Sequence, residues 1–308
     1  MTDKKKRSRY EVTVIIPVYN EAGVIGPVIQ GVRELFPDYE VLAVDDGSTD
    51  ASAKEAAAAG AKVVRHIYNR GNGAAIKTGI RSAHGRILVL MDGDGQHDPA
   101  QIPSLLEHVG RYDMVVGARD FKNQGARHRS LANLVFSAVG TYLADHKVED
   151  LTSGFRAIRR DLALRFAYLL PNTFSYPSTI TLALFKAGYG VKYVPIHVQG
   201  RVGHSKIKII RDGLRFFAIM FKIVSLFNPM KVFFPLGMLF LASGVTYAFL
   251  RILIQGQRLT NPMILMIGIA LLIFALGLIS EQIALLRLER IDDTPPGVEP
   301  EEDREDKE

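Results

Sequence analysis

The chain contains no cysteine, and this absence excludes several kinds of chemistry. Disulfides, thiolate nucleophiles and thiolate metal sites are ruled out, so any bound metal must be held by oxygen or imidazole ligands. Acidic residues are fewer than basic ones, 32 against 38, which leaves a formal net charge of +6. Hydrophobic residues make up 48% of the 308 positions, which is ample for a folded core.

The two ends of the chain differ in charge from the rest. Residues 1–9 are basic, and no apolar run long enough for a signal peptide follows them. Nine of the last seventeen residues are acidic and almost none is apolar, which predicts an acidic, disordered tail over 289–308. We therefore expect a basic N-terminal tail and an acidic C-terminal tail, and any catalytic part of the chain should stay in the cytosol.

Two long apolar runs near the C-terminus contain no charged residue. They comprise residues 232–250 and 259–280, and each is long enough to cross a bilayer as a helix, which needs roughly 20 residues. A buried helix pair in a soluble protein is the alternative, but two adjacent runs with charged flanks are hard to bury in a core. We predict a transmembrane hairpin over 230–288, with helices at about 232–252 and 259–281.

Lysine and arginine are distributed unevenly around this hairpin. Residues 199–231 carry seven of them, whereas the loop between the two runs carries Arg251 and Arg258. Because the more basic side of membrane helices faces the cytoplasm, we expect the catalytic domain and both termini to be cytoplasmic. If the protein is a homo-oligomer, the hairpin is the part through which we expect its copies to associate.

Residues 205–229 have the pattern of an amphipathic helix at the membrane interface, where anionic headgroups meet acyl chains. An ordinary core helix with a solvated basic edge is the alternative. Apolar side chains recur on one face and basic side chains on an adjacent stripe: Ile207, Ile210, Leu214, Phe217 and Phe221 against Lys208, Arg211, Arg215 and Lys222.

Residues 10–204 alternate short β-branched runs with helix-like stretches. This alternation predicts an α/β domain with a mainly parallel, Rossmann-like sheet. In such sheets ligands bind beyond the carboxyl ends of the strands. Three predicted strands end in the sequences PVYNE, DDGSTD and DGDGQHDP. Acidic residues are therefore concentrated where we expect a binding site.

The densest acidic segment, residues 89–99, places Asp92, Asp94 and Asp98 directly after an apolar strand. It lacks the glycine and the acid that an EF-hand calcium loop needs at its sixth and twelfth positions. Asp92 and Asp94 are an oxygen pair of the kind that holds Mg²⁺ or Mn²⁺ while diphosphate oxygens fill other positions, and Gln96 is placed to add a neutral oxygen. A solvated acidic turn is the alternative for this pair alone.

The motifs taken together are more specific than any one of them. Their order along the chain is VIIPVYNE (14–21), VDDGSTD (44–50), RGNGAAIKTG (70–79) and MDGDGQHDP (91–99), which closely resembles the family 2 glycosyltransferases of the GT-A type. The later segments GAR (117–119), DLTSGFRAIRRD (150–161) and GRVGHSKI (200–207), followed by membrane helices, resemble the polyprenyl-phosphate branch that dolichol-phosphate mannose synthase typifies. The resemblance implies a GT-A catalytic domain over 10–204.

The resemblance also implies which residues bind a nucleotide-sugar donor. In this family the turns after the first two strands hold the nucleotide, and the glycine-rich segment lies near the diphosphate. Asp92, Asp94 and Gln96 would hold the metal, Mg²⁺ or Mn²⁺, and Asp45 would have a structural part. The donor-binding positions on this chain are Pro17, Tyr19, Glu21, Asp46, Gly73, Lys77 and Asp92.

A lipid phosphate acceptor is implied by the same resemblance. The planar guanidinium of arginine matches two phosphate oxygens at once. Two features depart from the family, so the sugar and the lipid are left open: Asn133 stands where a serine is usual, and the anchor has two helices rather than one or four. The acceptor-binding positions are Arg119, Arg129, Asn133, Arg201 and Lys206, with Arg127 as an alternative to Arg129.

A phosphate acceptor changes what the catalytic residues must do. A hydroxyl acceptor needs a general base, whereas a lipid monophosphate, with a second pKa near about 6, is already an anionic nucleophile. Catalysis then requires alignment of the phosphate with the anomeric carbon and neutralisation of the departing diphosphate, which predicts inversion. We assign these roles to Asp94, Arg119, Arg129 and Arg201. Asp150 either takes part in proton transfer or sugar-hydroxyl contact, or caps the TSGF turn.

The sequence therefore predicts a membrane-anchored, metal-dependent, inverting glycosyltransferase that moves one sugar from a GDP- or UDP-sugar to dolichyl or undecaprenyl phosphate. Alternatives are transfer to a hydroxyl of a non-lipid acceptor, and a non-catalytic membrane scaffold that binds a nucleotide-sugar. A processive polysaccharide synthase is disfavoured, because such enzymes carry a Gln-x-x-Arg-Trp element and this chain has no tryptophan. No recognition motif accompanies the basic residues, so we expect no nucleic-acid partner.

Overall fold

The computed structural model describes seven stretches of the chain: residues 10–119, 138, 141–142, 146–172, 176–198, 228–256 and 261–289. The described residues up to Val198 form one compact unit, and those from Asn228 onward form a second. Apart from residues 228–229 and 289, the predicted tails and the predicted amphipathic segment lie outside the described residues.

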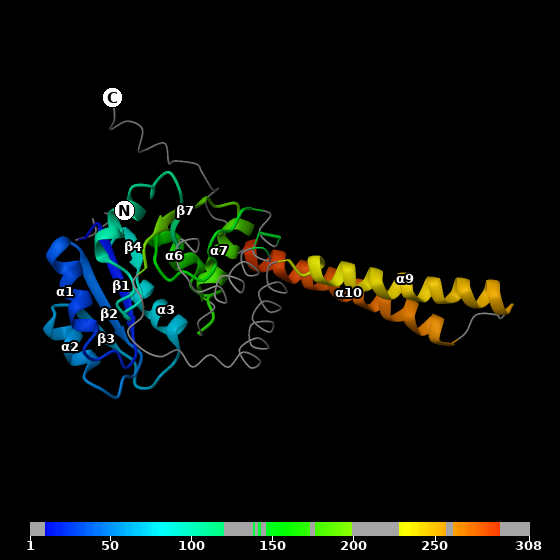
Figure 1. Cartoon of the computed structure of the whole chain (residues 1–308), viewed down its shortest axis with the longest axis horizontal. Coiled ribbons are helices and arrows are strands. Elements are labelled where there is room, and N and C mark those ends of the chain that lie inside the picture. Colours follow the sequence, from blue (N-terminus) through cyan, green and yellow to red (C-terminus); the bar gives the residue numbers. More distant parts are fainter. Residues whose placement is uncertain are drawn as a thin grey trace, which may run out of the picture. The chain divides into compact units, whose positions relative to one another are not determined.

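The first unit is built, within the described residues, on a seven-stranded sheet in the order β3-β2-β1-β4-β6-β5-β7 (Figure 1). Strand β6 runs antiparallel to its neighbours β4 and β5, and the other neighbouring strands pair in parallel. The predicted mainly parallel, Rossmann-like sheet is thus confirmed, with one reversed strand. The strands are β1 (Val12–Val18), β2 (Glu40–Asp45), β3 (Lys62–Arg65), β4 (Ile87–Leu90), β5 (Met114–Arg119), β6 (Arg156–Arg159) and β7 (Val191–Ile196).

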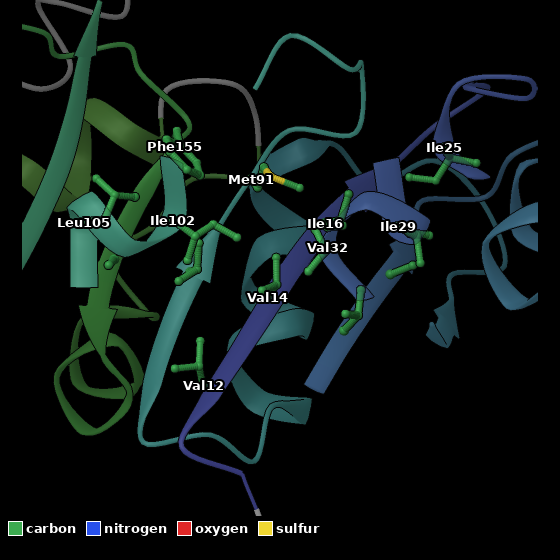
Figure 2. Close-up of a cluster of buried hydrophobic side chains, with 14 of the residues drawn as sticks. Val12, Val14, Ile16, Ile25, Ile29, Val32, Met91, Ile102, Leu105 and Phe155 are labelled. Atoms are coloured by element: carbon green, nitrogen blue, oxygen red, sulfur yellow. The ribbon is translucent and has the colours of Figure 1, made fainter. Parts of the chain in front are cut away.

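Helices cover the faces of this sheet, and central strand β1 is buried on both sides, as a parallel strand between helices must be. Its alternate residues Val12, Val14 and Ile16 line the core that also contains side chains of α1 and α4 (Figure 2). Its opposite face meets α3 so closely that a Cβ at Gly79 would lie 2.4 Å from Cγ2 of Ile15. The helices are α1 (Ile25–Leu35), α2 (Ser52–Ala58), α3 (Asn72–Ser82), α4 (Ile102–Leu106), α6 (Arg160–Phe166) and α7 (Tyr176–Lys186), with a 3₁₀ turn η1 (Pro99–Gln101).

A buried carboxylate stabilises the sheet at the start of β2, away from the carboxyl ends of the strands. Glu40 Oε2 accepts a hydrogen bond of 2.6 Å from Thr13 Oγ1 and one of 2.8 Å from the backbone N–H of His84. The other oxygen, Oε1, lies 2.8 Å from His84 Nδ1. Burial raises the pKa of Glu40, but the hydrogen bonds from Thr13 and His84 outweigh it and hold the pKa below its ordinary value.

We expect Glu40→Gln to lower the free energy of unfolding at neutral pH by about 1–3 kcal/mol, because it replaces a buried, hydrogen-bonded carboxylate. A depressed folded-state pKa adds stability above the unfolded value of about 4.3, and this stability is lost as pH falls through the folded-state pKa. The difference between wild type and variant, measured by thermal unfolding, should therefore shrink between pH 7 and pH 3. A difference that does not change with pH would contradict this account.

The second unit is a pair of long apolar helices, α9 (Met230–Gln255) and α10 (Asn261–Glu289), which run side by side (Figure 1). The stretches Met230–Leu253 and Asn261–Leu286 are long and apolar enough to cross a membrane. In the apolar windows of these stretches only 11% and 17% of the residues are buried, which suits lipid contact better than a soluble core. The predicted helices at 232–252 and 259–281 correspond to α9 and α10.

Glycines allow the two helices of this hairpin to approach closely. A Cβ at Gly237 would lie 2.6 Å from the ring of Phe274, and a Cβ at Gly277 would lie 2.8 Å from Cβ of Phe233. Small residues play this part in membrane helix pairs, where association depends on packing. Helix α9 ends at Gln255, and the φ of 58° at the following Gly256 is the left-handed conformation that glycine adopts at helix C-termini.

Candidate active site

Strands β1 and β2 end together, and the turns that follow them are joined by hydrogen bonds. Val18 pairs with Asp45 in parallel register, and the N–H of Asp46 donates to the carbonyl of Val18 at 2.8 Å. The N–H of Asn20 donates to Ser48 Oγ at 3.0 Å. The two turns expected to hold a nucleotide therefore form one continuous edge.

Three of the predicted donor-binding residues lie on the β1 side of this edge. Pro17 is the penultimate residue of β1 and pairs with Val44. Tyr19 is 45% exposed, so its ring is accessible to a ligand. The N–H of Glu21 donates to Ser52 Oγ at 2.8 Å, which ties the turn to the start of α2. The structure thus brings Pro17, Tyr19 and Glu21 together.

Asp46, also predicted to contact the nucleotide, is buried and hydrogen-bonded to the protein. Its carboxylate accepts from the backbone N–H groups of Arg70, at 2.9 Å, and Gly71, at 2.7 Å. It also lies 2.7 Å from Nδ1 of His66, whose Nε2 is 2.8 Å from Thr78 Oγ1. In the structure Asp46 therefore positions the glycine-rich loop that begins α3, a role that the sequence did not reveal.

Lys77, predicted to lie near the diphosphate, joins α3 to the segment that follows α6. Its ammonium donates to the carbonyl of Leu170 at 3.1 Å and to the side-chain oxygen of Asn172. The N–H of Ala74 also reaches the carbonyl of Asn172, at 3.2 Å, and Gly73 beside it is buried. Burial, together with two neighbouring arginines, lowers the pKa of Lys77. The first turns of α3 and residues 170–172 therefore form one connected structure.

The acidic turn after β4 lies at the same edge of the sheet, because β4 is the other neighbour of β1. Gly93 packs tightly there: a Cβ at this position would lie 3.0 Å from the carbonyl oxygen of Pro17. Asp94 is partly buried and accepts from the N–H of Gln96 at 3.2 Å. Gly95, with φ of +74°, reverses the chain between these residues. The structure thus brings the acidic turn next to the nucleotide turns.

Asp92, Asp94 and Gln96 carry the kind of oxygen ligand that Mg²⁺ or Mn²⁺ takes, and the sequence predicts that they hold a cation shared with a substrate. The side chain of Asp92 is 35% exposed, and among the described residues its ion-pair partner is His97, with Nε2 3.7 Å from Oδ2. Within the same residues no group of three or more histidines and acids is arranged to hold a metal. Magnesium is commonly bound by one or two carboxylates plus substrate phosphates, and such a site needs no complete protein cage.

Arg119, at the end of β5, makes a two-pronged ion pair with Asp150. Arg119 Nε lies 2.8 Å from Oδ2 of Asp150 and Nη2 lies 3.0 Å from Oδ1, and Nη2 also donates to Oγ1 of Thr152. Burial lowers the pKa of Arg119, but the hydrogen bond and charge of Asp150 outweigh it and raise the pKa. The Arg119 side chain is 27% exposed.

Asp150 itself is almost fully buried and stays ionised. Burial raises its pKa, but the hydrogen bond and charge of Arg119 outweigh this effect and lower the pKa. Its Oδ1 also accepts from the backbone N–H groups of Thr152, at 2.9 Å, and Ser153, at 3.1 Å. The capping of the TSGF turn, one of the two roles considered for Asp150, is therefore present in the structure.

The structure adds three residues that sequence reasoning did not place in the site: Gly154, His97 and Phe155. Gly154 lies against Asp92 so closely that a Cβ would be 2.4 Å from Oδ2 of that carboxylate. His97, for which the sequence offered no role, is buried and stacks on Phe155 with ring centroids 5.0 Å apart. The TSGF motif was visible in the sequence, but its contact with the acidic turn was not. The predicted acceptor residues Arg129, Asn133, Arg201 and Lys206, and the alternative Arg127, lie outside the described residues.

We expect Gly154→Ala to weaken Mn²⁺ binding by roughly 10–100-fold, the range found when groups that support a metal ligand are changed. The added methyl group cannot coexist with the Asp92 carboxylate in its present position. Binding is measured by the loss of the free Mn²⁺ electron paramagnetic resonance signal in the presence of a nucleoside diphosphate. Gly26→Ala, on α1 with nothing within 4 Å of the new methyl group, is the matched control and should bind as wild type does. Equal binding by both variants would contradict the contact.

The chain matches two family models, one in each unit. Residues 13–165 match the model described as glycosyl transferase family 2, and residues 228–286 match the GtrB C-terminal hairpin. A dodecaprenyl-phosphate galacturonate synthase of Rhizobium johnstonii is 26% identical over 298 residues, covering 89% of this chain and 88% of that protein. An undecaprenyl-phosphate 4-deoxy-4-formamido-L-arabinose transferase of Pseudomonas fluorescens is 30% identical over 268 residues, covering 79% of this chain and 73% of that protein.

Solved structures share the architecture at lower sequence identity. The glucosyl-3-phosphoglycerate synthase of Mycobacterium tuberculosis, crystallised with Mn²⁺, UDP-glucose and phosphoglyceric acid, has a TM-score of 0.56 and 22% identity to this chain. The match covers 70% of this chain and 79% of that one. Because sequence identity is low, this likeness shows a common fold and leaves the substrates to be argued from the site.

Proposed function

Because this chain belongs to glycosyl transferase family 2 and is a glycosyltransferase, we propose that it transfers one sugar from a nucleotide-sugar to a polyprenyl phosphate at a membrane. The observation that carries the proposal is that the segment 150–156 contacts both halves of the proposed site. Gly154 packs against Asp92, an acid of the proposed metal pair. Asp150 holds Arg119, the proposed anion-binding residue. A site of this kind would bring a metal-bound diphosphate and a phosphate acceptor together. The apolar hairpin and the names of the two relatives support a lipid as the carrier of that phosphate.

The donor side of the proposed site is the edge formed by the turns after β1, β2 and β4. The exposed ring of Tyr19 and the backbone around Pro17 and Glu21 would contact the nucleoside, and Asp46 would keep the glycine-rich loop in place beside it. A bound Mg²⁺ or Mn²⁺, held by Asp92, Asp94 and Gln96, would neutralise charge on the departing diphosphate.

The acceptor side of the proposed site is built around Arg119. Its guanidinium, held by Asp150 on one edge, would bind the lipid phosphate and direct one oxygen at the anomeric carbon. The new bond joins that oxygen to the anomeric carbon while the bond to the diphosphate oxygen breaks, and the nucleoside diphosphate leaves with the electron pair. No proton has to be removed from the acceptor, so Asp150 can remain an ionised partner of Arg119. Arg129 or Arg127, Asn133, Arg201 and Lys206 would complete the phosphate site.

The proposed function is tested with purified full-length protein in nanodiscs, supplied with a polyprenyl phosphate, Mg²⁺ or Mn²⁺ and a panel of UDP- and GDP-sugars. Mass spectrometry should detect a lipid-linked sugar whose formation requires the metal, and the panel identifies the donor. Transfer to a sugar hydroxyl in place of the lipid phosphate would overturn the lipid assignment. The absence of any donor binding would favour a non-catalytic scaffold.

The absence of native cysteine makes the proposed membrane orientation directly measurable. We propose that the catalytic unit is cytoplasmic and that residues 257–260, between α9 and α10, are on the opposite side. A cysteine at Gln257 should react with a membrane-impermeant maleimide added to intact cells. A cysteine at the exposed Ala57 on α2 should react only after the cells are permeabilised. The reverse labelling pattern would overturn this orientation.

A further inference from the structure

Arg156, the first residue of β6, is a fully buried cation, and no carboxylate among the described residues forms an ion pair with it. Its side chain is 0% exposed, and the hydrogen bonds that it makes within these residues go to neutral groups. Nε donates to the carbonyl of Ser153 at 3.1 Å, and Nη2 donates to the same oxygen. Nη1 donates to the carbonyl of Pro177 at 3.0 Å and to Oγ1 of Thr181 at 3.1 Å. Burying a charge in this way is costly, so its presence calls for a physical reason.

Two carboxylates of the candidate active site interact electrostatically with Arg156. Burial lowers the pKa of Arg156, whereas charge interactions with Tyr176 and Tyr193, and then with the carboxylates of Asp150 and Asp92, act in the opposite direction. Asp150 begins the segment 150–156, and Asp92 packs against this segment at Gly154. The buried guanidinium is therefore a positive charge that attracts both carboxylates.

Arg156 is also connected to the site mechanically. It holds the carbonyl of Ser153, and the N–H of Ser153 donates to Asp150, the partner of Arg119. The next residue, Gly154, is the one that packs against Asp92. One side chain thus determines where the turn sits relative to the acidic loop and to Arg119, and it anchors this turn to α7 through Pro177 and Thr181.

We propose that Arg156 is a positioning residue that sets the distance between Asp92 and the Arg119–Asp150 pair. It thereby sets the distance between the donor and acceptor sites. This inference rests on the proposed function. Arg156 touches neither substrate, and its influence passes through the backbone of residues 153–154 and through its charge. Lysine at this position keeps the charge but lacks the planar fork that holds one carbonyl with two N–H groups.

The test compares Arg156→Lys with Leu184→Ala, which removes a fully buried side chain of the same helix, α7. Thr181→Val is a milder variant that removes one acceptor of the guanidinium and keeps the charge. For each we would measure the thermal midpoint, Mn²⁺ affinity with UDP or GDP by electron paramagnetic resonance, and kcat and KM for sugar transfer. Arg156→Lys should lower Mn²⁺ affinity and kcat by roughly 10–100-fold, and Thr181→Val should lower both by a smaller factor.

Leu184→Ala separates positioning from stability, because it should lower the thermal midpoint while leaving Mn²⁺ affinity and kcat of the folded protein unchanged. If Arg156→Lys and Thr181→Val behave like Leu184→Ala, Arg156 is only a core residue and the proposal is wrong. If the wild type makes no lipid-linked sugar, the proposed function is wrong, but the Mn²⁺ affinities of the variants still test the positioning role of Arg156. A loss of Mn²⁺ affinity confined to Arg156→Lys and Thr181→Val supports the positioning role whichever acceptor is used.

Discussion

Asp92→Asn is expected to lower the rate of sugar transfer by a factor of roughly 10²–10³, because a metal that neutralises transition-state charge contributes several kcal/mol and each 1.36 kcal/mol is tenfold in rate. Asparagine has nearly the shape of aspartate, so it preserves the packing against Gly154 while removing the charge that binds the cation. The measurement is the transfer rate as a function of Mn²⁺ concentration. Higher Mn²⁺ should restore part of the activity.

Asp98→Asn is the matched control for this prediction. Asp98 belongs to the same acidic turn, but its Oδ1 accepts from the N–H of Ala100 at 2.9 Å and caps the turn η1. The substitution removes the same charge and should leave transfer nearly unchanged. Equal losses in Asp92→Asn and Asp98→Asn would mean that overall acidity matters more than a metal site, which would contradict the assignment.

Arg119→Lys is expected to reduce kcat/KM for the lipid acceptor by roughly 10–100-fold, since lysine cannot hold a carboxylate and a phosphate with one planar fork. Mn²⁺ affinity should stay close to that of wild type, because the substitution leaves Asp92 and Gly154 in place. Transfer assays at varied polyprenyl phosphate concentration measure the first quantity, and electron paramagnetic resonance measures the second. Weakened Mn²⁺ binding with unchanged acceptor kinetics would reverse the assigned role.

Arg119→Lys keeps the positive charge at this position, so its free energy of unfolding should differ from that of a variant that removes the charge. Arg119→Met would leave the buried carboxylate of Asp150 without its ion-pair partner, and breaking a buried pair in this way costs about 3–5 kcal/mol. Arg159→Lys is a control for the lysine substitution, because Arg159 is 48% exposed and pairs with Asp161 on the surface. It should change neither acceptor kinetics nor stability by much.

The fold class followed from the alternation of apolar runs, because period and composition are local properties of the chain. The predicted α/β fold with a mainly parallel sheet is confirmed, as are the GT-A type that the family resemblance implied and the apolar hairpin. The reversed direction of β6 was not foreseen. Its sequence RAIR has two arginines in four positions, and the direction in which a strand pairs depends on partners that are distant in the chain.

Local sequence also indicated most of the donor side of the candidate site, since turns that follow neighbouring strands meet at one edge of a parallel sheet. It did not indicate that Asp46 holds the glycine-rich loop or that Lys77 binds residues 170–172. These contacts join segments that have no regular spacing between them. The assignments of individual residues to donor, metal and acceptor remain predictions that the variants above would test.

The amino-acid sequence by itself determined the class of fold, the position of two apolar helices and the family to which the chain belongs, because each depends on short-range patterns and ordered motifs. Only the tertiary structure decided how the site is supported. Gly154 packs on Asp92, Asp150 holds Arg119, and the buried Arg156 holds the carbonyl of Ser153 in the same segment. These relations depend on close packing between strands that are remote in sequence, where a few tenths of an ångström decide whether a side chain fits.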